Sequence, residues 1–319
     1  MVLTAISEYF WLLVQSYLVF RFLKCMYIVS MSVYGHFIKK PMDISHLLDK
    51  WCVVTGATDG IGRAYIEELA KTRGVRKFYL IARNENKLNK VKEELIRDYK
   101  AEIKTAIFDF ESTDYSTLPK ELSTLDVGIL VNCVGIAPDR VANFYELPHD
   151  LPSKILRVNL MSCMHMIETI LPGMIERDAG VIVNVASMTG WRPLPYMSTY
   201  PASKAAISFY SDTLADEFHH TNVKVTCLIP LLVATKIASY ETSEANDIFV
   251  IRPDTYARYA VNILGNFRIS TGCFFHDMQI ALGTLVSFWG FKQVFVPTVM
   301  LGIHKKRVES YQIANSKKE

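Results

Sequence analysis

The sequence predicts an α/β fold with a doubly wound parallel sheet, on two observations. Short apolar runs rich in valine and isoleucine alternate with longer segments of helical periodicity across residues 48–278. The apolar runs are nearly continuous rather than alternating with polar residues, as in strands that are buried on both faces. Alternating strands and helices form one parallel sheet with helices on both sides, and ligands then bind beyond the carboxyl ends of the strands.

The first predicted strand, WCVVT at residues 51–55, is short, holds two consecutive valines and ends at a glycine. A helix is predicted directly after it, and the alternation then continues to the end of a sixth strand. The later strands are expected at residues 78–82, 103–108, 127–132, 181–186 and 223–229, and the helices at 61–71, 85–99, 152–175 and 200–219.

Composition limits the classes of function. The chain has 319 residues, of which 50% are apolar and 21% charged, so one well-packed domain with appendages is expected and general disorder is excluded. A net charge of +3, without blocks of basic residues among aromatics, predicts no nucleic-acid partner. The six cysteines form no C-x-x-C pair and read as reduced thiols. No H-E-x-x-H motif or cluster of ligands predicts a metal site.

Residues 1–47 are predicted to be a membrane-associated segment and linker. Residues 9–20 and 25–33 are apolar, separated by Arg21 and Lys24, and neither run alone is long enough to cross a bilayer. The two runs could join into one anchor helix or lie as two segments at the interface. Lys39 and Lys40 follow, and the positive-inside rule then leaves the rest of the chain in the cytosol.

Residues 279–319 form a third region, with an apolar and aromatic stretch at 280–303 and a charged tail. Lys292 and Gln293 interrupt the stretch, and Lys305, Lys306 and Arg307 follow it. Membrane contact is one interpretation. A core helix or a lid over the substrate pocket is the other.

The glycine turn after the first strand predicts a dinucleotide site. Residues 55–62 read TGATDGIG, in which Gly56, Gly60 and Gly62 permit a tight turn and a close approach of the backbone to a pyrophosphate. The start of the following helix supplies amide groups and a positive dipole. The residues expected to bind the cofactor here are Thr55, Gly56, Asp59, Gly60, Ile61 and Gly62.

Arg83 predicts NADP(H) rather than NAD. It follows the second strand, where an NAD enzyme carries an acidic residue for the ribose hydroxyls, and its guanidinium suits a 2′-phosphate. Arg63 at the glycine turn is expected to add positive charge. Asp109, after the third strand, is expected to accept a hydrogen bond from the adenine amino group. The alternative is that Asp109 is a simple turn residue.

Ser187, Tyr200 and Lys204 are the candidate catalytic residues. Tyr200 and Lys204 lie one turn apart at the start of a predicted helix, and Ser187 closes the fifth strand. A free tyrosine has a pKa of about 10, and we expect the Lys204 ammonium and an oxidised nicotinamide to lower it. Tyr200 would then protonate a carbonyl oxygen as hydride reaches the carbon, Ser187 would stabilise the developing charge, and Lys204 would also hold the ribose.

These motifs resemble the short-chain dehydrogenases/reductases across residues 48–275. The resemblance implies a Rossmann-type sheet of seven strands and a homodimer packed through helices near 151–176 and 200–219. It implies that Asn159 in RVNL is a fourth catalytic residue, which anchors a water, and that Asn132 in NCVG stabilises the sheet beside the cofactor. Cys133 replaces the family's second asparagine. In PLLVAT, Leu231 stands where the family has glycine, and Val233 and Thr235 are expected to contact the nicotinamide amide.

Within that family, the sequence is similar to the 17-beta-hydroxysteroid dehydrogenase type 3 and 12 group, which includes microsomal very-long-chain 3-oxoacyl-CoA reductases. The resemblance implies an endoplasmic reticulum membrane enzyme, facing the cytosol, that uses NADPH to reduce a lipophilic 3-oxoacyl-CoA or 17-ketosteroid. Two alternatives remain open: a reductase of retinal or another lipid carbonyl, and a catalytically inactive membrane-tethered binding protein.

Overall fold

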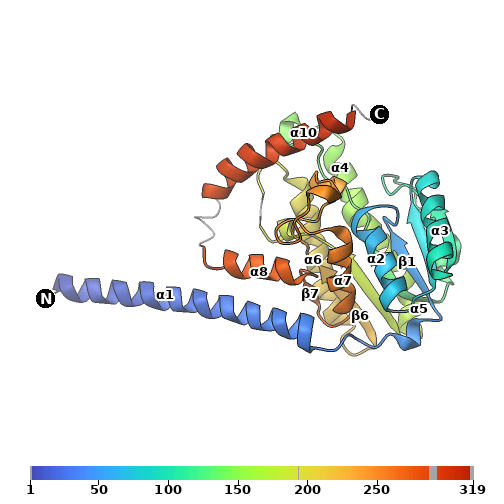
Figure 1. The fold of residues 1–319 in the computed structure, drawn as a ribbon, viewed down its shortest axis with the longest axis horizontal. Helices are drawn as coiled ribbons and strands as arrows, with labels where there is room; N and C mark the ends of the chain where they lie inside the picture. The colour runs from blue at the N-terminus through green and yellow to red at the C-terminus, as the bar shows by residue number, and fades with distance from the viewer. Residues whose placement is uncertain (1, 193, 287–292, 317–319) are drawn as a thin grey trace.

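The computed structural model describes residues 2–192, 194–286 and 293–316. Its centre is a seven-stranded parallel sheet in the order β3-β2-β1-β4-β5-β6-β7 (Figure 1). This confirms the predicted doubly wound fold. The strands are β1 (Trp51–Thr55), β2 (Lys77–Ala82), β3 (Glu102–Ile107), β4 (Val127–Asn132), β5 (Gly180–Val185), β6 (Val223–Leu228) and β7 (Ile269–Ser270).

The sheet is covered on both faces, which explains its continuous apolar strands. Val54 belongs to a core under α2 (Gly60–Thr72), α3 (Glu85–Tyr99) and α7 (Pro253–Asn262). Its neighbour Val53 belongs to a second core under α5 (Ser162–Glu176) and α6 (Thr199–Glu217). Successive side chains of a strand point to opposite faces, so each strand contributes to both cores.

The six predicted strands agree with the observed ones to within two residues at either end. The long helix predicted over residues 152–175 is present as α4 (Leu151–Leu156) and α5, joined by the wide π-helical turn η5 (Arg157–Met161). The pattern did not place β7, whose two residues are too few to show a periodicity. Parallel pairing of β7 with β6 completes the seven strands.

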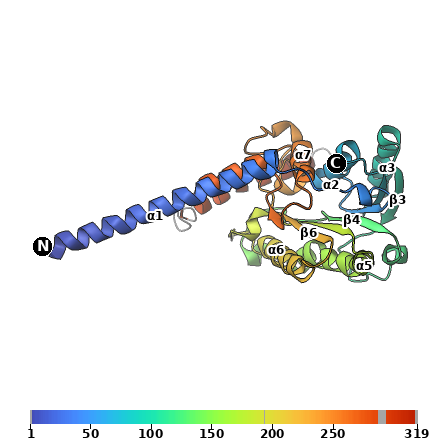
Figure 2. The same ribbon diagram turned by 90° about the horizontal axis from the view of Figure 1, so that it is seen from below.

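The N-terminal region is one continuous helix, α1 (Val2–Val33), followed by the turn η1 (Tyr34–Ile38). It extends far beyond the sheet domain (Figures 1 and 2). Leu13, Phe20 and Tyr27 are among its many exposed apolar side chains. Residues Ile6–Ile38 are long and apolar enough to cross a membrane, with 6% of the most apolar window buried. The less apolar Leu151–Glu176 passes the same test but packs on the sheet, since Ile155, Met166 and Met174 are buried.

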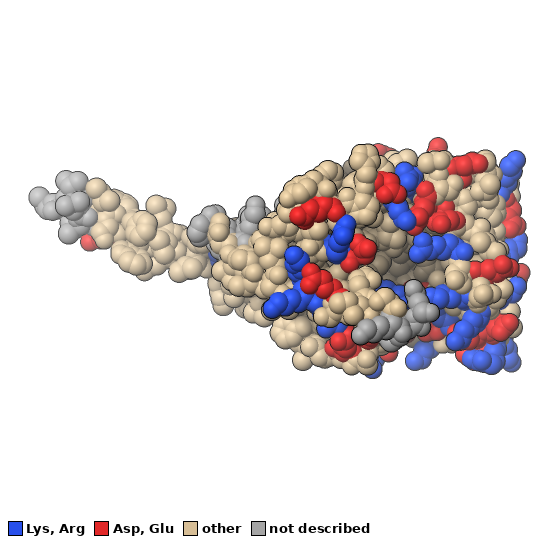
Figure 3. Space-filling view, turned by 90° about the horizontal axis from the view of Figure 1, so that it is seen from above, with Lys and Arg blue, Asp and Glu red and all other residues tan. Residues whose placement is uncertain are grey.

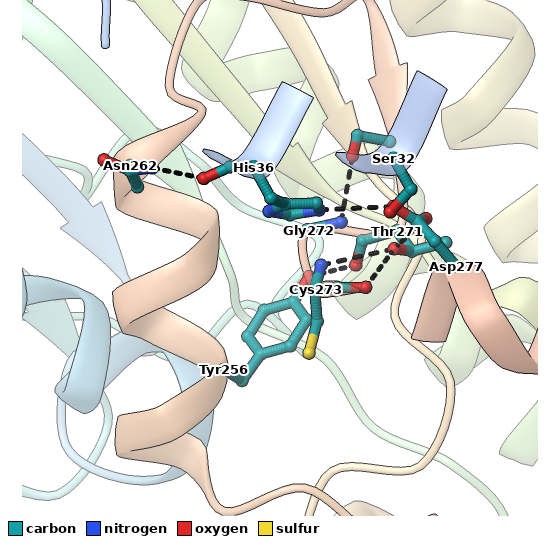
Figure 4. Close-up of polar contacts among 9 residues, drawn as sticks. Ser32, His36, Tyr256, Asn262, Thr271, Gly272, Cys273 and Asp277 are labelled. Carbon is teal, nitrogen blue, oxygen red and sulfur yellow. Dashed lines mark hydrogen bonds and ion pairs between the residues drawn. The ribbon is translucent and has the colours of Figure 1, made fainter. Parts of the chain in front are cut away.

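Helix α1 is attached to the domain through α8 (Phe274–Gly283), which runs beside it. Asp277 of α8 accepts hydrogen bonds from Ser32 at 2.7 Å and Thr271 at 2.6 Å, and its carboxylate lies 3.2 Å from Nε2 of His36 (Figure 4). Asn262 of α7 donates to the His36 carbonyl. Ser32 and His36 both contact the same carboxylate oxygen, so these residues fasten the helix rather than form a nucleophile and its base.

The C-terminal arm, residues 293–316, includes η9 (Val296–His304) and α10 (Lys305–Ser316). Its side chains Met300 and Val308 are buried in a cluster with Tyr200 and Met197. Met300 of the 280–303 stretch therefore packs on the domain, whereas Val294 and Ile303 of the same stretch are exposed, so membrane contact and a cover over the pocket both stay predictions. Residues 287–292 of that stretch lie outside the described residues.

Candidate active site

A cleft of 680 Å³ opens at the carboxyl ends of the strands, as the fold class predicts. It is lined by residues that follow β1, β2, β3, β4, β5 and β6, and by Gln312 of the C-terminal arm. In the space-filling view the domain is hollowed between basic and acidic side chains (Figure 3). Its volume lies within the usual range for a small-molecule or cofactor site.

The glycine turn forms one wall of this cleft. Gly56 has φ +69°, and a Cβ there would lie 2.9 Å from the Val134 backbone. A Cβ at Gly62 would collide with the Gly56 carbonyl oxygen. Gly56, Asp59, Gly60 and Ile61 line the cleft at the start of α2, and the Asp59 side chain accepts from the Gly60 amide at 2.8 Å. Only a turn without side chains leaves this cradle open, and it fits a dinucleotide phosphate.

Thr55 does not line the cleft but supports it. Its buried hydroxyl accepts hydrogen bonds from the amides of Cys133 at 3.1 Å and Val134 at 3.3 Å. These bonds tie the end of β1 to the segment after β4, which lines the cleft. Gly62 is likewise buried behind the turn. The two residues therefore shape the wall without facing the cavity.

Arg83 and Asp109 lie at the end of the cleft where the adenosine is expected. The Arg83 guanidinium is 64% exposed and lies 3.0 Å from Glu111, a carboxylate that also pairs with Lys154 at 2.7 Å. Asp109 accepts from the Glu111 amide at 3.0 Å, as a turn residue does. Glu111 is thus shared by two cations, and Arg83 keeps positive charge for an incoming phosphate.

Arg63 does not add charge to the cleft, contrary to the expectation from sequence. Its guanidinium lies 2.5 Å from Glu67 and 2.9 Å from Glu94, and it donates to the Val91 carbonyl. Helix α2 turns this side chain away from the glycine turn and toward α3. Two carboxylates therefore neutralise it between α2 and α3.

Ser187, Tyr200 and Lys204 meet in the cleft. Ser187 follows β5, and its hydroxyl accepts a hydrogen bond from the Thr189 hydroxyl at 3.0 Å. Lys204 is one turn along α6 from Tyr200, with Nζ 5.9 Å from the centre of the phenol ring. Its ammonium donates to the Val185 carbonyl at 2.8 Å. The end of β5 and the start of α6 therefore bring all three polar groups to one place.

Burial governs the pKa of both titratable groups. Burial raises the pKa of Tyr200 to about 12, and the Ser187 hydrogen bond offsets only part of that rise. Burial also lowers the pKa of Lys204. The protein groups alone thus do not lower the pKa of the phenol, contrary to what we expected of Lys204. The lowering ascribed to an oxidised nicotinamide stays a prediction.

Neither asparagine lines the cleft. Asn159, in the η5 turn, accepts from the Ile136 amide at 2.8 Å and donates to the Ile136 carbonyl and to Ser203 at 3.0 Å. Asn132, at the end of β4, donates to Asn184 of β5 at 2.9 Å. Asn132 therefore holds two central strands together, and its contact with a cofactor would be indirect.

The PLLVAT segment follows β6 and forms the opposite wall. Val233 and Thr235 both line the cleft. Leu231 is not among the residues with positive φ, so the absence of the family's glycine there requires no left-handed backbone. The Leu231 amide donates to Nδ1 of His276, whose Nε2 lies 3.3 Å from the Leu232 carbonyl. Burial against this segment lowers the pKa of His276 to about 4.

Several lining residues were not predicted as cofactor contacts from the sequence, notably Lys87, Lys236 and Gln312. Lys87 lies four residues after Arg83 in the first turn of α3, and Lys236 directly follows Thr235. Proximity in sequence to predicted site residues was the available signal for these lysines. No sequence signal marked Gln312, since only folding brings α10 to the cleft.

The other site predictions concern metals and thiols. Within the described residues, no group of three or more His, Cys, Asp or Glu side chains could hold a metal ion. All six cysteines are free thiols and five are buried. Burial raises the pKa of Cys133 to about 11, although this side chain lines the cleft. A thiol with a raised pKa is a poor nucleophile.

The sequence matches known oxidoreductases. The family model for short chain dehydrogenases matches residues 50–246. The very-long-chain 3-oxoacyl-CoA reductase of Mus musculus is 35% identical over 253 residues, covering 78% of this chain and 79% of that protein. An uncharacterized oxidoreductase of Caenorhabditis elegans, dhs-27, is 56% identical over 179 residues, which are 56% of this chain and 22% of that protein. The chain thus spans under a quarter of the nematode protein.

Solved structures share the fold. A short-chain dehydrogenase from Sphingobium yanoikuyae in complex with NADPH is 23% identical, with a TM-score of 0.59 over 66% of this chain and 83% of that one. A 7beta-hydroxysteroid dehydrogenase reaches a TM-score of 0.63 at 23% identity, over 72% and 88% of the two chains. With the match of the family model over most of the sheet domain, these findings establish that the chain belongs to the short-chain dehydrogenase family.

Proposed function

We propose that this protein is a membrane-bound oxidoreductase that uses NADPH to reduce a lipophilic ketone to its alcohol. The observation that carries the proposal is the meeting of Ser187, Tyr200 and Lys204 in one cleft, beside a buried apolar cluster. NADP(H) is the proposed cofactor, because Arg83 stands where an acidic residue would select NAD. Gly56, Gly60 and Arg83 would hold its phosphates, and bound NADPH would supply the hydride.

The protein groups would handle the oxygen of the substrate. Tyr200, protonated at neutral pH, donates its proton to the carbonyl oxygen. Ser187 hydrogen-bonds the same oxygen as negative charge develops on it. Lys204 is fixed by Val185 and would hold the cofactor ribose. The amide N–H groups of Asn159 are engaged, so the water of a proton relay would donate to an oxygen of this residue.

The apolar surroundings of Tyr200 support an apolar substrate. Met197 and Val141 from the domain, with Met300 and Val308 from the C-terminal arm, are buried in one cluster with the phenol. Among lipophilic ketones we favour a 3-oxoacyl-CoA, because relatives that match most of the chain have that activity in their names. A 17-ketosteroid is the alternative within the same reaction.

The proposed site of action is the endoplasmic reticulum membrane, with the catalytic domain in the cytosol. The apolar side chains of α1 are exposed along its length, and Arg21 and Lys24 are the cations within the helix. Lys39 and Lys40 lie between it and the domain, on the cytosolic side by the positive-inside rule. Substrates that partition into the bilayer would then reach the enzyme without crossing water.

A homodimer through α4, α5 and α6 is also proposed. Leu156, Met161 and Phe209 are exposed apolar side chains on these segments, and Phe209 is 77% exposed. Burial of such side chains favours association. The mass of the detergent-solubilised protein by light scattering, compared with that of a Phe209→Lys variant, tests this arrangement.

The test of the function is NADPH oxidation by full-length protein in nanodiscs. A long-chain 3-oxoacyl-CoA, a 17-ketosteroid and retinal serve as substrates, and Tyr200→Phe serves as the inactive control. Turnover of the acyl-CoA that is lost in the variant supports the proposal. Turnover of retinal alone would identify the protein as a reductase of retinal or another lipid carbonyl. Nucleotide binding without turnover of any lipid carbonyl would leave the inactive tethered protein as the function.

A further inference from the structure

Two lysine side chains face the cleft from its opposite walls. Lys87 belongs to the first turn of α3, after β2, and Lys236 begins the 3-10 turn η7 (Lys236–Ala238), after β6. Both side chains line the cleft, and both residues are exposed. The two side chains therefore bring positive charge to the cleft from its two walls.

Lys236 also connects its own wall to the glycine turn. Its Nζ lies 3.0 Å from Oδ2 of Asp59, the residue that caps α2. Next to it in sequence, Thr235 packs over Gly60, where a Cβ would lie 3.1 Å from the Thr235 methyl group. The two walls are therefore closest at the glycine turn, where a dinucleotide diphosphate binds in this type of fold.

The charges of this pair are incompletely balanced. Neighbouring ammonium groups repel each other, and the carboxylate of Asp59 is bonded to Lys236 rather than to Lys87. The neighbouring Lys236 holds the pKa of Lys87 below its ordinary value, and Arg83 contributes in the same direction. An anion with several negative charges placed between the lysines would relieve this repulsion.

We propose that Lys87 and Lys236 form a clamp that closes over the phosphate groups of the dinucleotide. Lys87 acts on the 2′-phosphate, because it shares the end of β2 with Arg83. Lys236 acts on the diphosphate, because it lies against the glycine turn. The clamp rests on the proposed function for the identity of the ligand, NADP(H), but not for the substrate or for turnover.

The turn that carries Lys236 is held in place by the C-terminal arm. Arg307 of α10 donates through Nε to the Ser239 carbonyl at 2.9 Å and forms an ion pair with Glu244. Its guanidinium carbon lies 3.7 Å from the centre of the Tyr240 ring. Ser239, which ends η7, has φ 57°. These contacts hold the segment that carries Lys236 in place after β6.

Nucleotide binding without substrate tests the clamp. NADPH and NADH are titrated into the full-length protein in nanodiscs, and energy transfer from protein tryptophan to the reduced nicotinamide reports binding. Lys87→Met should weaken NADPH binding about tenfold and leave NADH binding nearly unchanged, since it removes one charge-assisted hydrogen bond. Lys236→Met should weaken both nucleotides about tenfold, since both carry the diphosphate.

Lys90→Met is the matched control, because Lys90 is exposed on the same helix and does not line the cleft. It should bind both nucleotides as the wild type does. Wild-type affinities in both clamp variants would overturn the clamp. Equal weakening of NADPH and NADH by Lys87→Met would overturn its assignment to the 2′-phosphate. Wild-type protein that binds the nucleotides but reduces no ketone would sink the proposed function and leave the clamp standing.

Discussion

The ammonium group of Lys204 donates a hydrogen bond to the Val185 carbonyl at 2.8 Å, at the point where β5 ends beside the cleft. This bond holds a buried cation between the strand and α6, one turn from the Tyr200 phenol. A buried ammonium is costly unless its donors are satisfied. The proposed catalytic group is therefore built on the junction of a strand and a helix.

Tyr200→Phe should lower kcat by at least about a hundredfold, because it removes the proton donor and little else. Phenylalanine keeps the ring within the apolar cluster that contains Met197 and Met300. The dissociation constant of NADPH should stay within about twofold of the wild type. Steady-state kinetics and fluorescence titration measure the two quantities. Retained turnover would remove the phenol from its proposed role.

The pH dependence should differ between the two directions of the reaction. Reduction uses the protonated phenol, and burial raises the pKa of Tyr200 to about 12. Titration of this group should therefore cause no loss of reduction rate between about pH 6 and pH 9. Oxidation uses the phenolate, so its rate should rise with pH over the same range. Initial rates in both directions check this, and an oxidation rate independent of pH would contradict it.

Arg83→Ala should reduce the preference for NADPH over NADH about tenfold, because one charged partner of the 2′-phosphate is lost. The ratio of kcat/KM for the two nucleotides is the measurement. Arg97→Ala is a suitable control, since Arg97 is exposed on α3 and paired with Asp98. An unchanged ratio in Arg83→Ala would mean that another group reads the phosphate.

His276 should make the fold less stable in acid. Its pKa is lowered by burial to about 4 from an ordinary value of 6.5. The unfolded chain therefore binds the proton first as pH falls. The stability is fully present above pH 6.5 and is lost progressively toward pH 4, in total about 3 kcal/mol. Thermal unfolding at several pH values measures the loss.

The control for that prediction is His276→Gln, which can still donate and accept a hydrogen bond but does not titrate. The variant should be less stable than the wild type at neutral pH and should show a smaller loss between neutral pH and pH 5. The same slope in both proteins would assign the acid sensitivity to other groups.

Removing residues 1–40 should weaken membrane association and leave the sheet domain folded. The cut removes Ser32 and His36, which bond to Asp277, but Thr271 still donates to that carboxylate. The expected loss of stability is about 1–2 kcal/mol. Flotation with liposomes and circular dichroism test the two parts. Complete flotation of the truncated protein would assign the anchor to the C-terminal region.

The part of the fold that could be predicted from sequence is the part that local patterns encode. Apolar runs such as residues 51–55 have to lie in a covered sheet, and glycine at positions 56 and 62 is required by the approach of neighbouring backbone. The tyrosine and lysine of α6 are four residues apart, so any helix places them on one face. These features depend on neighbours within a few residues along the chain.

The long-range partners of charged side chains could not be predicted in this way. The sequence predicts Arg63 as a charge beside the cofactor, but α3 supplies Glu94 and the side chain points toward that helix. Lys87 and Lys236 are 149 positions apart, and only the packing of β2 and β6 around the cleft brings them together. The pKa of Tyr200 was also misjudged, because the burial that raises it comes partly from the distant C-terminal arm.

The sequence by itself thus determined the alternation of strands and helices, the glycine turn and the residue types of the catalytic group, since each is set by local sterics, hydrogen bonding and periodicity. Only the tertiary structure decided that the N-terminal apolar runs form one helix fastened by Asp277, that the C-terminal arm packs against Tyr200, and which cations face the cleft. Those outcomes depend on burial and on charge partners that lie far apart in the chain. Local sequence patterns do not encode such long-range contacts.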